Sequence, residues 1–437
     1  MKHVIGLKCT ICGAEYAVDD VSYVCPKHGD DGILDVMYDY DAIRAGFSPA
    51  ALAQTPTDAG IWRYKPLLPV QPDSPVPPLH VGWTPLYAAP RLAELLGLRH
   101  VWVKDDGVNP TASFKDRASA LAVVKAQEAG VQIVTTASTG NAAAALAGLA
   151  ASVGLQAVIF VPKTAPPAKI AQHLIYGARV LLVDGTYDDA FELTLKVAKE
   201  FGWYNRNTAY NPYMSEGKKT AAYEICEQLT VGARHPRPGP AFAQRPAPDA
   251  SPLRTPDRVF VPVGDGCIIG GIYKGFRDLL ALGWIDAMPK IMGIQAAGSS
   301  ALVDAWERGL QGWEMTPQPA DTIADSISAG LPRDRIKALA AVRETDGAYL
   351  RVSDQEILDA IPVIARNTGV FSEPAAAAAY AGLVKAVEKG LADPDERIVV
   401  LLTGSGLKDI NSAMKTVAQP PIVAPNLDAV KAVMSNE

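Results

Sequence analysis

The hydrophobic positions of the chain form short β-branched runs that alternate with segments of helical spacing. The apolar runs cover residues 100–106, 132–138, 156–162, 178–185, 258–266, 290–295 and 397–406. Most of them are separated by stretches in which apolar residues recur every three or four positions, as on one face of a helix. Because strands that alternate with helices build parallel sheets covered on both faces, the pattern predicts an α/β fold with open, mostly parallel twisted sheets.

Two α/β domains and a small extra module account for the length of the chain and its punctuation. We expect a small N-terminal β module over residues 1–60 and a small α/β domain over residues 131–204. The large domain then comprises residues 61–130 and 205–437. Within it, the proline-rich segment 233–257 has no periodicity, so we expect a mobile insertion there.

Charge and hydropathy limit the partners of the protein. The 437 residues carry a formal net charge of −6 and no long basic run, which argues against nucleic acid and favours a small-molecule substrate. The uncharged stretch from Ala142 to Val161 is long enough to cross a bilayer, but it divides at Gly154 into an alanine-rich helix and a β-rich strand. We therefore expect no membrane span. The N-terminus lacks the apolar core of a secretory signal, and we expect a cytoplasmic protein.

Three of the five cysteines and one histidine stand near the N-terminus in two short pairs. Cys9 and Cys12 form a CxxC pair, and Cys25 and His28 form a CxxH pair. Four such ligands suit a tetrahedral, structural zinc site. The alternative is a small β-rich module in which the same residues bind no metal. The odd number of cysteines argues against a disulfide framework.

A lysine at the start of a helix is the first candidate for chemistry. Ser113 and Asp116 resemble a capping box ahead of an apolar run, which places Lys115 in the first helical turn. The helix dipole is positive there and disfavours an ammonium group. The plain interpretation is a surface lysine whose ammonium reaches water. The alternative is a lysine whose pKa is lowered by the dipole and by partial burial, as a Schiff-base nucleophile requires.

Three further turns rich in small and polar residues follow expected strands. One opens the alanine-rich helix and consists of Ser138, Thr139, Gly140 and Asn141. Free N–H groups at a helix start bind a carboxylate or a phosphate. The segment "VPVGDGCIIGG" (261–271) places glycines between a strand and a helix, where backbone N–H groups can surround a phosphate. Thr403 ends the last strand with a hydroxyl group. Ligands of open parallel sheets bind beyond the carboxyl ends of the strands, so we expect these turns to share one site.

The glycine-rich segment does not fit a dinucleotide-binding fingerprint. After Gly264 and Gly266 the third glycine is displaced by one residue, to Gly270, and the next strand ends in Gln295 instead of an acid. A lysine with a suppressed charge, a phosphate cradle, a carboxylate site and a hydroxyl group match pyridoxal phosphate. We therefore predict an enzyme that uses this cofactor.

The chain also resembles a known family in these motifs. They are "GWTPLY", "NPTASFKDR", "STGNAAAAL", "NPYMSEGKKT", "VPVGDGCIIGG", "FSEPAAAAAY" and "LLTGSGLKD", between Gly82 and Asp409. Their identity and order are similar to those of the threonine synthases, within the pyridoxal-phosphate β-family. The resemblance implies the fold type of the tryptophan synthase β-subunit, and the N-terminal cysteine module also has counterparts in this group.

The resemblance implies a role for each matching residue. Lys115 would be the Schiff-base lysine and proton shuttle, Phe114 would pack beside the cofactor ring, and Asn141 would hydrogen-bond its 3′-oxygen. Thr403 would face the pyridine nitrogen. The cofactor phosphate would be held by backbone groups of Gly264, Asp265, Gly266, Cys267 and Ile268. The substrate carboxylate would be held by Ser138, Thr139, Gly140 and Asn141.

Several positions depart from the threonine-synthase pattern. Ala142 stands where a threonine is common, and Met214 stands where an arginine is usual, which removes two possible ligands of a substrate phosphate. Candidates to compensate are Lys218, Lys219 and Arg206, although each is by default a solvated surface charge.

Two acids stand near the expected site. Asp265 replaces a usual asparagine, and beside a phosphate it would contribute only its N–H group. Glu373 begins a helix, where an acid complements the dipole; a role near the cofactor ring is the alternative.

The resemblance implies a lyase that forms threonine from O-phosphohomoserine. Lys115 would remove the α-proton and move protons so that phosphate leaves the γ-carbon and water adds at the β-carbon. A second hypothesis, motivated by Ala142 and Met214, is β-elimination or β-replacement on a shorter amino acid, as in a threonine/serine dehydratase or a cysteate-synthase-like enzyme acting on phosphoserine. A third is a catalytically idle relative that binds a ligand. The family also suggests a homodimer.

Overall fold

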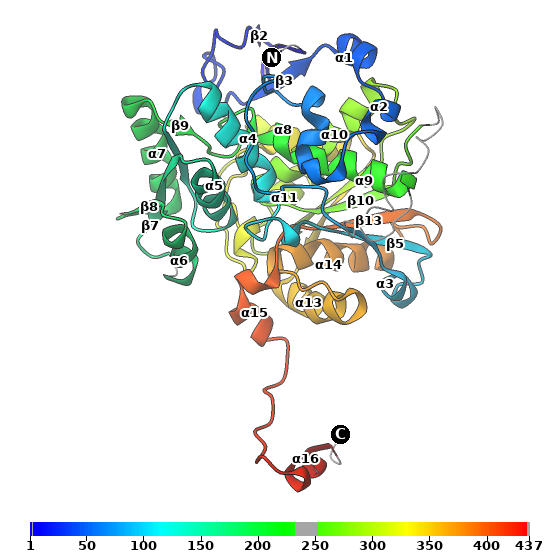
Figure 1. Ribbon diagram of the computed structural model, residues 1–437. Helices are drawn as coiled ribbons and strands as arrows, with labels where there is room; N and C mark the ends of the chain where they lie inside the picture. Colours follow the sequence, from blue (N-terminus) through cyan, green and yellow to red (C-terminus); the bar gives the residue numbers. More distant parts are fainter. Residues whose placement is uncertain (2, 166, 232–251, 435–437) are drawn as a thin grey trace.

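Three separate β-sheets organise the protein, which is described here by a computed structural model (Figure 1). The structure describes residues 1, 3–165, 167–231 and 252–434, and residues 167–169 by their backbone only. Most of the proline-rich insertion expected at 233–257 lies outside the described residues, and its remainder contains no helix or strand.

The largest sheet has six strands in the order β12-β11-β10-β13-β5-β4. All neighbouring strands in it are parallel except the edge pair β4 and β5. The strands are β4 (Leu86–Ala88), β5 (His100–Asp105), β10 (Arg258–Pro262), β11 (Lys290–Ala296), β12 (Tyr349–Val352) and β13 (Arg397–Leu402). Parallel strands alternate with helices along the chain, which confirms the predicted α/β class.

The second sheet has four parallel strands in the order β8-β7-β6-β9. They are β6 (Ile133–Ala137), β7 (Gln156–Pro162), β8 (Arg179–Val183) and β9 (Tyr204–Asn205). The third sheet is antiparallel, with β1 (Val4–Cys9) between β2 (Glu15–Tyr16) and β3 (Leu34–Tyr38). We propose that the six-stranded and four-stranded sheets form the cores of the large and small domains expected from the sequence.

Sixteen α-helices connect and cover these sheets within the described residues. The first eight are α1 (Tyr40–Gly46), α2 (Pro49–Ala53), α3 (Pro90–Leu95), α4 (Lys115–Glu128), α5 (Asn141–Ser152), α6 (Pro167–Ile175), α7 (Tyr187–Phe201) and α8 (Met214–Lys218). The second eight are α9 (Thr220–Val231), α10 (Cys267–Ala281), α11 (Ala301–Glu307), α12 (Arg335–Arg343), α13 (Asp354–Thr368), α14 (Pro374–Glu388), α15 (Ile410–Met414) and α16 (Leu427–Met434).

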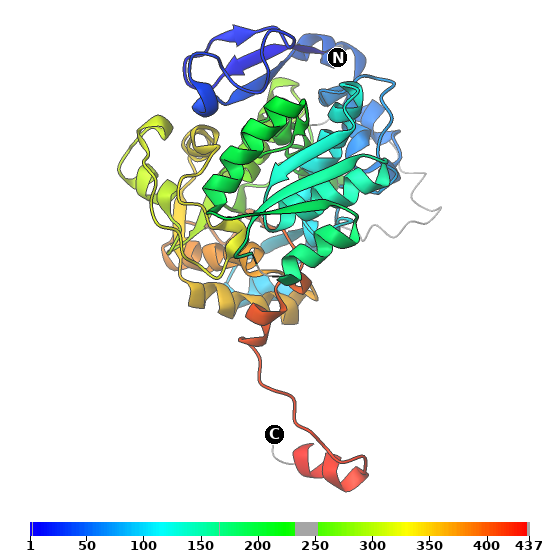
Figure 2. The ribbon, with the colours of Figure 1, turned by 90° about the vertical axis from the view of Figure 1, so that its left-hand side faces the viewer.

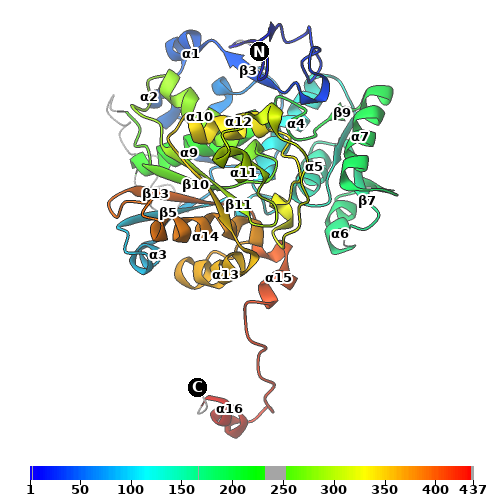
Figure 3. The ribbon, with the colours of Figure 1, turned by 180° about the vertical axis from the view of Figure 1, so that it is seen from behind.

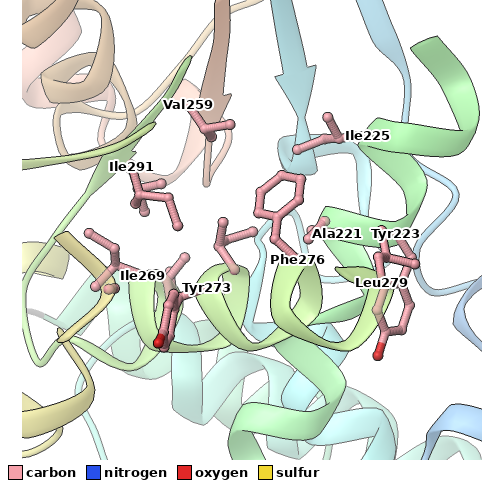
Figure 4. Packing of buried hydrophobic residues seen from close by; sticks show 14 of the residues in the cluster. Ala221, Tyr223, Ile225, Val259, Ile269, Tyr273, Phe276, Leu279 and Ile291 are labelled. Atoms are coloured by element: carbon pink, nitrogen blue, oxygen red, sulfur yellow. The ribbon is translucent and has the colours of Figure 1, made fainter. Parts of the chain in front are cut away.

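Both faces of the six-stranded sheet are buried, because successive side chains of a strand point to opposite sides. Val259 and Val261 of β10 belong to the cluster formed with α9, α10 and α12, whereas Phe260 belongs to the cluster formed with α3, α13 and α14. Figure 4 shows the first cluster, in which Phe276 of α10 lies near Ile225 of α9. The four-stranded sheet is covered in the same way by α4 and α5 on one face and α7 on the other.

The two ends of the chain lie on opposite sides of this body. The N-terminal sheet packs at one end of the molecule, and α16 projects from the other end (Figures 2 and 3). Alanine-rich α5 ends before Gly154, which has a left-handed φ of +74° and leads into β7. Nowhere in the described part of the chain is a helix long and apolar enough to cross a membrane.

Candidate active site

The strand-end turns singled out in the sequence meet at the carboxyl ends of the two parallel sheets. A cavity of about 600 Å³ opens there, and its wall includes Lys115, Arg206 and Asp265 together with all four residues of the turn after β6. A second cavity of about 610 Å³ shares residues 139–141 with the first and adds His173, Glu373 and Lys408. The expected site residues that line neither cavity are Phe114, Gly264, Gly266, Cys267, Ile268 and Thr403.

The turn before α4 is tied to the end of β13. Phe114 N–H donates a 2.8 Å hydrogen bond to the carbonyl oxygen of Thr403, and Ser405 N–H donates to that of Ala112 at 3.1 Å. Both Phe114 and Thr403 are buried. These bonds fix the two turns relative to each other and place Lys115, the first residue of α4, against the cavity.

The prediction of a capping box at the start of α4 was wrong. Phe114 is the N-cap residue, and no side chain caps the helix. The carboxylate of Asp116 turns back instead and accepts hydrogen bonds from the N–H (2.7 Å) and the hydroxyl group of Thr111. Two donors on one residue compete successfully with the single N–H group that a capping box offers. The helix nevertheless begins with Lys115, and burial lowers the pKa of its amine, with Arg206 as the next contribution.

A buried ionic network that the sequence did not reveal supports the first turn of α4. The guanidinium of Arg117 donates to Asp106 (2.6 Å) and to Glu224 (2.8 Å), and the ammonium of Lys104 donates to Glu224 (2.7 Å). All four side chains are fully buried. The network joins β5, α4 and α9, and Glu224 lies more than a hundred residues after Lys104 and Arg117 in the sequence. Only the fold brings them together, so no local spacing could have predicted it.

Asn141 connects the two sheets across the site. It is the first residue of α5, and its Nδ2 donates to Glu373 Oε1 at 2.9 Å and to Ser326 Oγ at 3.3 Å. Glu373 is the N-cap residue of α14 and makes no side-chain cap, so its carboxylate does not complete the helix start through a hydrogen bond. The carboxylate faces the cavity that Asn141 also lines.

The glycine loop after β10 packs closely against neighbouring segments of the chain. Gly266 has a left-handed φ of +86° and caps α10, and a Cβ atom at Gly264 would lie 2.7 Å from the backbone of Ile327. The carbonyl oxygen of Asp265 accepts from Asp334 N–H at 2.8 Å, which fixes the loop. Burial raises the pKa of the Asp265 carboxyl group. Free N–H groups at the start of a fifteen-residue helix, after a loop whose two glycines have no room for a side chain, fit the phosphate of pyridoxal phosphate.

Arg206, Lys218 and Lys219 are not the solvated surface charges expected by default. The exposed fraction of each side chain is 0%. Lys219 is neutralised by Glu216 and Asp278, both at 2.7 Å. Lys219 Nζ, Lys218 Nζ and Arg206 Nη2 all lack a hydrogen-bond partner. Among the described residues, however, Lys218 and Arg206 have no acid within ion-pair distance, in contrast to Lys219. The expectation was wrong because Lys218 ends the buried helix α8, Lys219 directly follows it, and Arg206 directly follows the buried strand β9.

The four expected metal ligands gather in the N-terminal module. The ligand atoms of Cys9, Cys12, Cys25 and His28 all lie within 4.8 Å of one another. His28 Nδ1 lies 3.6 Å from Cys25 Sγ and 3.8 Å from Cys9 Sγ. All five cysteines of the chain are free thiols.

A family model and several known proteins match most of this chain. The family model for pyridoxal-phosphate dependent enzymes matches residues 78–404. A threonine synthase from Methanocaldococcus jannaschii is 38% identical over 428 residues, which are 98% of each chain. A threonine synthase from Methanosarcina acetivorans is 40% identical over 427 residues, which are 97% of each chain.

Solved structures with lower identity share the architecture. Threonine deaminase isoform 2 from Solanum lycopersicum superposes with a TM-score of 0.61 at 23% identity, covering 76% of this chain and 87% of its own. Diaminopropionate ammonia lyase from Escherichia coli gives a TM-score of 0.62 at 19% identity, covering 84% and 91%. The protein thus belongs to the pyridoxal-phosphate dependent enzymes of the tryptophan synthase β-subunit fold type. Within them it is a threonine-synthase-like lyase, and pyridoxal phosphate is its cofactor.

Proposed function

We propose that the enzyme converts O-phospho-L-homoserine and water into L-threonine and phosphate. The observation that supports this reaction most is the half-buried amine of Lys115, in a cavity whose wall also carries the guanidinium of Arg206. Such a wall suits an amino acid that bears a second, anionic group. The two relatives named threonine synthase match nearly the whole chain.

The cofactor would be held by the turns that surround Lys115. Phe114 would pack beside its ring, Asn141 would donate to its 3′-oxygen, and Thr403 would face its pyridine nitrogen. The N–H groups of the loop from Gly264 to Ile268 would bind its phosphate. When bound, pyridoxal phosphate draws electrons away from the α-carbon of an amino acid and so makes the α-proton acidic.

Lys115 then moves the protons that the reaction needs. Its lowered pKa favours the neutral amine, which can take the α-proton and afterwards a β-proton. The electron pair left by the β-proton forms a double bond between the β- and γ-carbons as the bond from the γ-carbon to the phosphate oxygen breaks. Lys115 then returns a proton to the γ-carbon, the hydroxyl group of water adds at the β-carbon, and the α-carbon regains its proton. The atoms balance, because one water molecule enters and one phosphate leaves.

The turn after β6 orients the substrate. We propose that Ser138, Thr139, Gly140 and Asn141 bind the substrate carboxylate through N–H and side-chain groups at the start of α5. Gly140 N–H donates a 3.3 Å hydrogen bond to the hydroxyl oxygen of Ser138, which helps to fix the shape of the turn.

Rates of consumption of three separate substrates test this function. The enzyme loaded with cofactor is given O-phosphohomoserine, phosphoserine or threonine in separate assays, and consumption of each is followed. We expect O-phosphohomoserine to be consumed fastest. Preferred consumption of phosphoserine or threonine would instead support β-replacement or β-elimination on a shorter amino acid, the alternative that Ala142 and Met214 favour.

We also propose that Cys9, Cys12, Cys25 and His28 bind one structural zinc ion. Zinc–sulfur bonds of about 2.3 Å in a tetrahedron place ligand atoms roughly 3.8 Å apart, close to the separations found here. With four protein ligands, no position is left open for catalysis, so the ion would only hold the module together.

A homodimer is our proposal for the assembly. Helix α16 projects from the body, and none of its residues is buried. Leu427 and Met434 are 66% and 64% exposed. A second copy is the partner that would cover these side chains. The mass of the full chain in solution, compared with that of a chain ending at Gln419, tests this assembly; equal monomer masses contradict it.

A further inference from the structure

Two cations in the core beneath the active site have no counter-charge bonded to them. Lys218 is fully buried and its Nζ has no hydrogen-bond partner, and the same holds for Arg206 Nη2. An uncompensated charge inside a protein is strongly destabilising, and proteins therefore pair such groups or neutralise them. The adjacent residue Lys219, paired with Glu216 and Asp278, shows the usual arrangement.

Hydrogen bonds fix Arg206 in place but leave one nitrogen of its guanidinium group without an acceptor. Its backbone N–H donates to Thr135 of β6 at 2.8 Å, its Nε donates to Ser119 Oγ at 3.1 Å, and its Nη1 donates to Thr208 Oγ1 at 2.7 Å. These bonds lock the guanidinium in the wall of the cavity that contains Lys115. Nη2 is then a fixed donor without an acceptor.

Lys218 approaches from the other side, at the end of α8. A Cβ atom at Gly271 would lie 2.7 Å from Lys218 Cβ, so the lysine packs against the first turns of α10. Burial lowers the pKa of Lys218 to about 8, and the charges of Arg206 and Lys115 add to the lowering. Three cations therefore act on one another around the start of α10. The nearby carboxylate of Asp334 forms an ion pair with Lys337 at 3.3 Å, so the negative charge of Asp334 is balanced by that lysine.

The chemistry of this arrangement selects a phosphate dianion over a carboxylate. A carboxylate carries one charge and two oxygens, whereas a phosphate monoester carries about two charges and three oxygens, which match two cations and a helix start. Met214, on the same short helix as Lys218, stands where the threonine-synthase pattern usually has an arginine that could bind a phosphate. Lys218 and Arg206 then supply the missing positive charge from different positions.

We propose that Lys218 and Arg206 together form the binding site for a phosphate dianion at the active-site cavity. The proposal rests on the proposed function, because both the cofactor and O-phosphohomoserine carry such a group. Either phosphate ester satisfies the two unpaired donors, and the experiment separates the two sources.

The test measures how inorganic phosphate raises the melting temperature of the full-length enzyme, first with the cofactor bound and then after its removal. The variants are Lys218→Gln and Arg206→Gln, and Lys163→Gln serves as a control because that lysine is exposed and pairs with the exposed Asp184. A ligand that binds the folded state raises its stability in a saturable way. We expect the control to respond as the wild type does, and both variants to lose the response.

The form of the enzyme that responds identifies the source of the phosphate. A response of the cofactor-loaded enzyme, lost in both variants together with an increase of tenfold or more in KM for O-phosphohomoserine, assigns the site to the substrate. A response found only after cofactor removal, lost in both variants together with a tenfold or greater loss of cofactor affinity, assigns it to the cofactor. Both results support the proposal.

Retention of the full phosphate response by both variants, in both forms, overturns the proposal. A second measurement guards against unfolding as an explanation. Lys218→Gln removes an unpaired buried charge. In the absence of cofactor and phosphate, we therefore expect this variant to melt at the same temperature as the wild type or at a higher one. A clearly lower melting temperature would mean that the ammonium of Lys218 has a structural partner, and it would also overturn the proposal. Failure of threonine formation with an intact, Lys218-dependent phosphate response would count against the proposed function alone. Threonine formation with unchanged KM and cofactor affinity in both variants would count against this site alone.

Discussion

The side-chain amide of Asn141 donates a 2.9 Å hydrogen bond to the carboxylate of Glu373. Asn141 begins α5, which covers the four-stranded sheet, and Glu373 precedes α14, which covers the six-stranded sheet. Both side chains are buried. The bond therefore links the two halves of the site at the point where the two cavities meet.

Replacing Asn141 with alanine removes this link and the group proposed to hold the cofactor's 3′-oxygen. We expect kcat/KM to fall roughly 100-fold, since loss of one oriented donor in an active site costs about that much. Glu373→Gln keeps an acceptor oxygen and should cost less than about tenfold, whereas Glu373→Ala should cost more. Steady-state kinetics measures all three. An Asn141→Ala enzyme within threefold of the wild type would contradict the role given to this residue.

Replacing Lys115 with alanine should abolish catalysis and remove the absorbance at the edge of the visible range that the cofactor gives when joined to a lysine. The matched control is Lys125→Ala, on the same helix but paired with Glu128 away from the cavity. The control should keep both properties. If the absorbance survived in Lys115→Ala, another lysine would hold the cofactor and the site would be misassigned.

The turns of the site could be predicted from the sequence because they are local. In residues 138–141 and 264–268, the small and polar residue types that suit anion binding are consecutive in the sequence. The order of parallel strands places such turns at one edge of a sheet. The capping role of Asp116 was predicted wrongly because Thr111, only five residues away, offers two donors. The spacing of residues alone cannot show whether the Asp116 carboxylate bonds to the helix start or to Thr111, because that depends on the path of the backbone through the turn.

Long-range charge pairing was beyond the reach of the sequence. Glu224 meets Arg117 and Lys104 only because α9 packs across α4 and β5. The burial of Lys218 contradicts the ordinary tendency of lysine to remain in water, and nothing in "EGKKT" separates it from Lys219. One of these neighbours is ion-paired and the other is not, and the difference arises from the tertiary structure alone.

Removing Glu224 should destabilise the protein far more than its size suggests. Glu224→Ala leaves Arg117 and Lys104 buried without their shared carboxylate, at a cost of about 3–5 kcal/mol. Glu15→Ala, which breaks the exposed pair with Lys8, should cost less than about 1 kcal/mol. Midpoints of urea denaturation compare the two variants. Similar shifts would show that the buried network contributes no more than a surface pair.

Stability should also depend on pH through Lys218. Its pKa is lowered to about 8 in the folded protein from an ordinary value of 10.5. Between these values the unfolded chain binds a proton that the folded chain does not, so the free energy of unfolding rises with pH, by up to about 3 kcal/mol. The rise should be visible without cofactor and phosphate, and should be missing in Lys218→Gln. An equal slope in wild type and variant would refute it.

Removal of zinc should loosen residues next to the active site. Tyr23, two residues before Cys25, accepts a 3.1 Å hydrogen bond from Asn205 N–H, and its ring lies 5.3 Å from that of Tyr210. Asn205 directly precedes Arg206. We expect one zinc ion per chain by elemental analysis, and loss of the ion in Cys25→Ser with altered tyrosine fluorescence and a lower melting temperature. A wild-type protein purified without a stoichiometric metal, and indifferent to chelators, would exclude the zinc site.

The most direct measurement is the ratio of phosphate released to threonine formed when the cofactor-loaded enzyme is given O-phosphohomoserine, with Lys115→Ala as the blank. We expect equal amounts of the two products and none from the blank. Phosphate without threonine, or no phosphate from an enzyme that retains its cofactor absorbance, would contradict it and would direct attention to Ala142 and Met214 as the positions that changed the substrate.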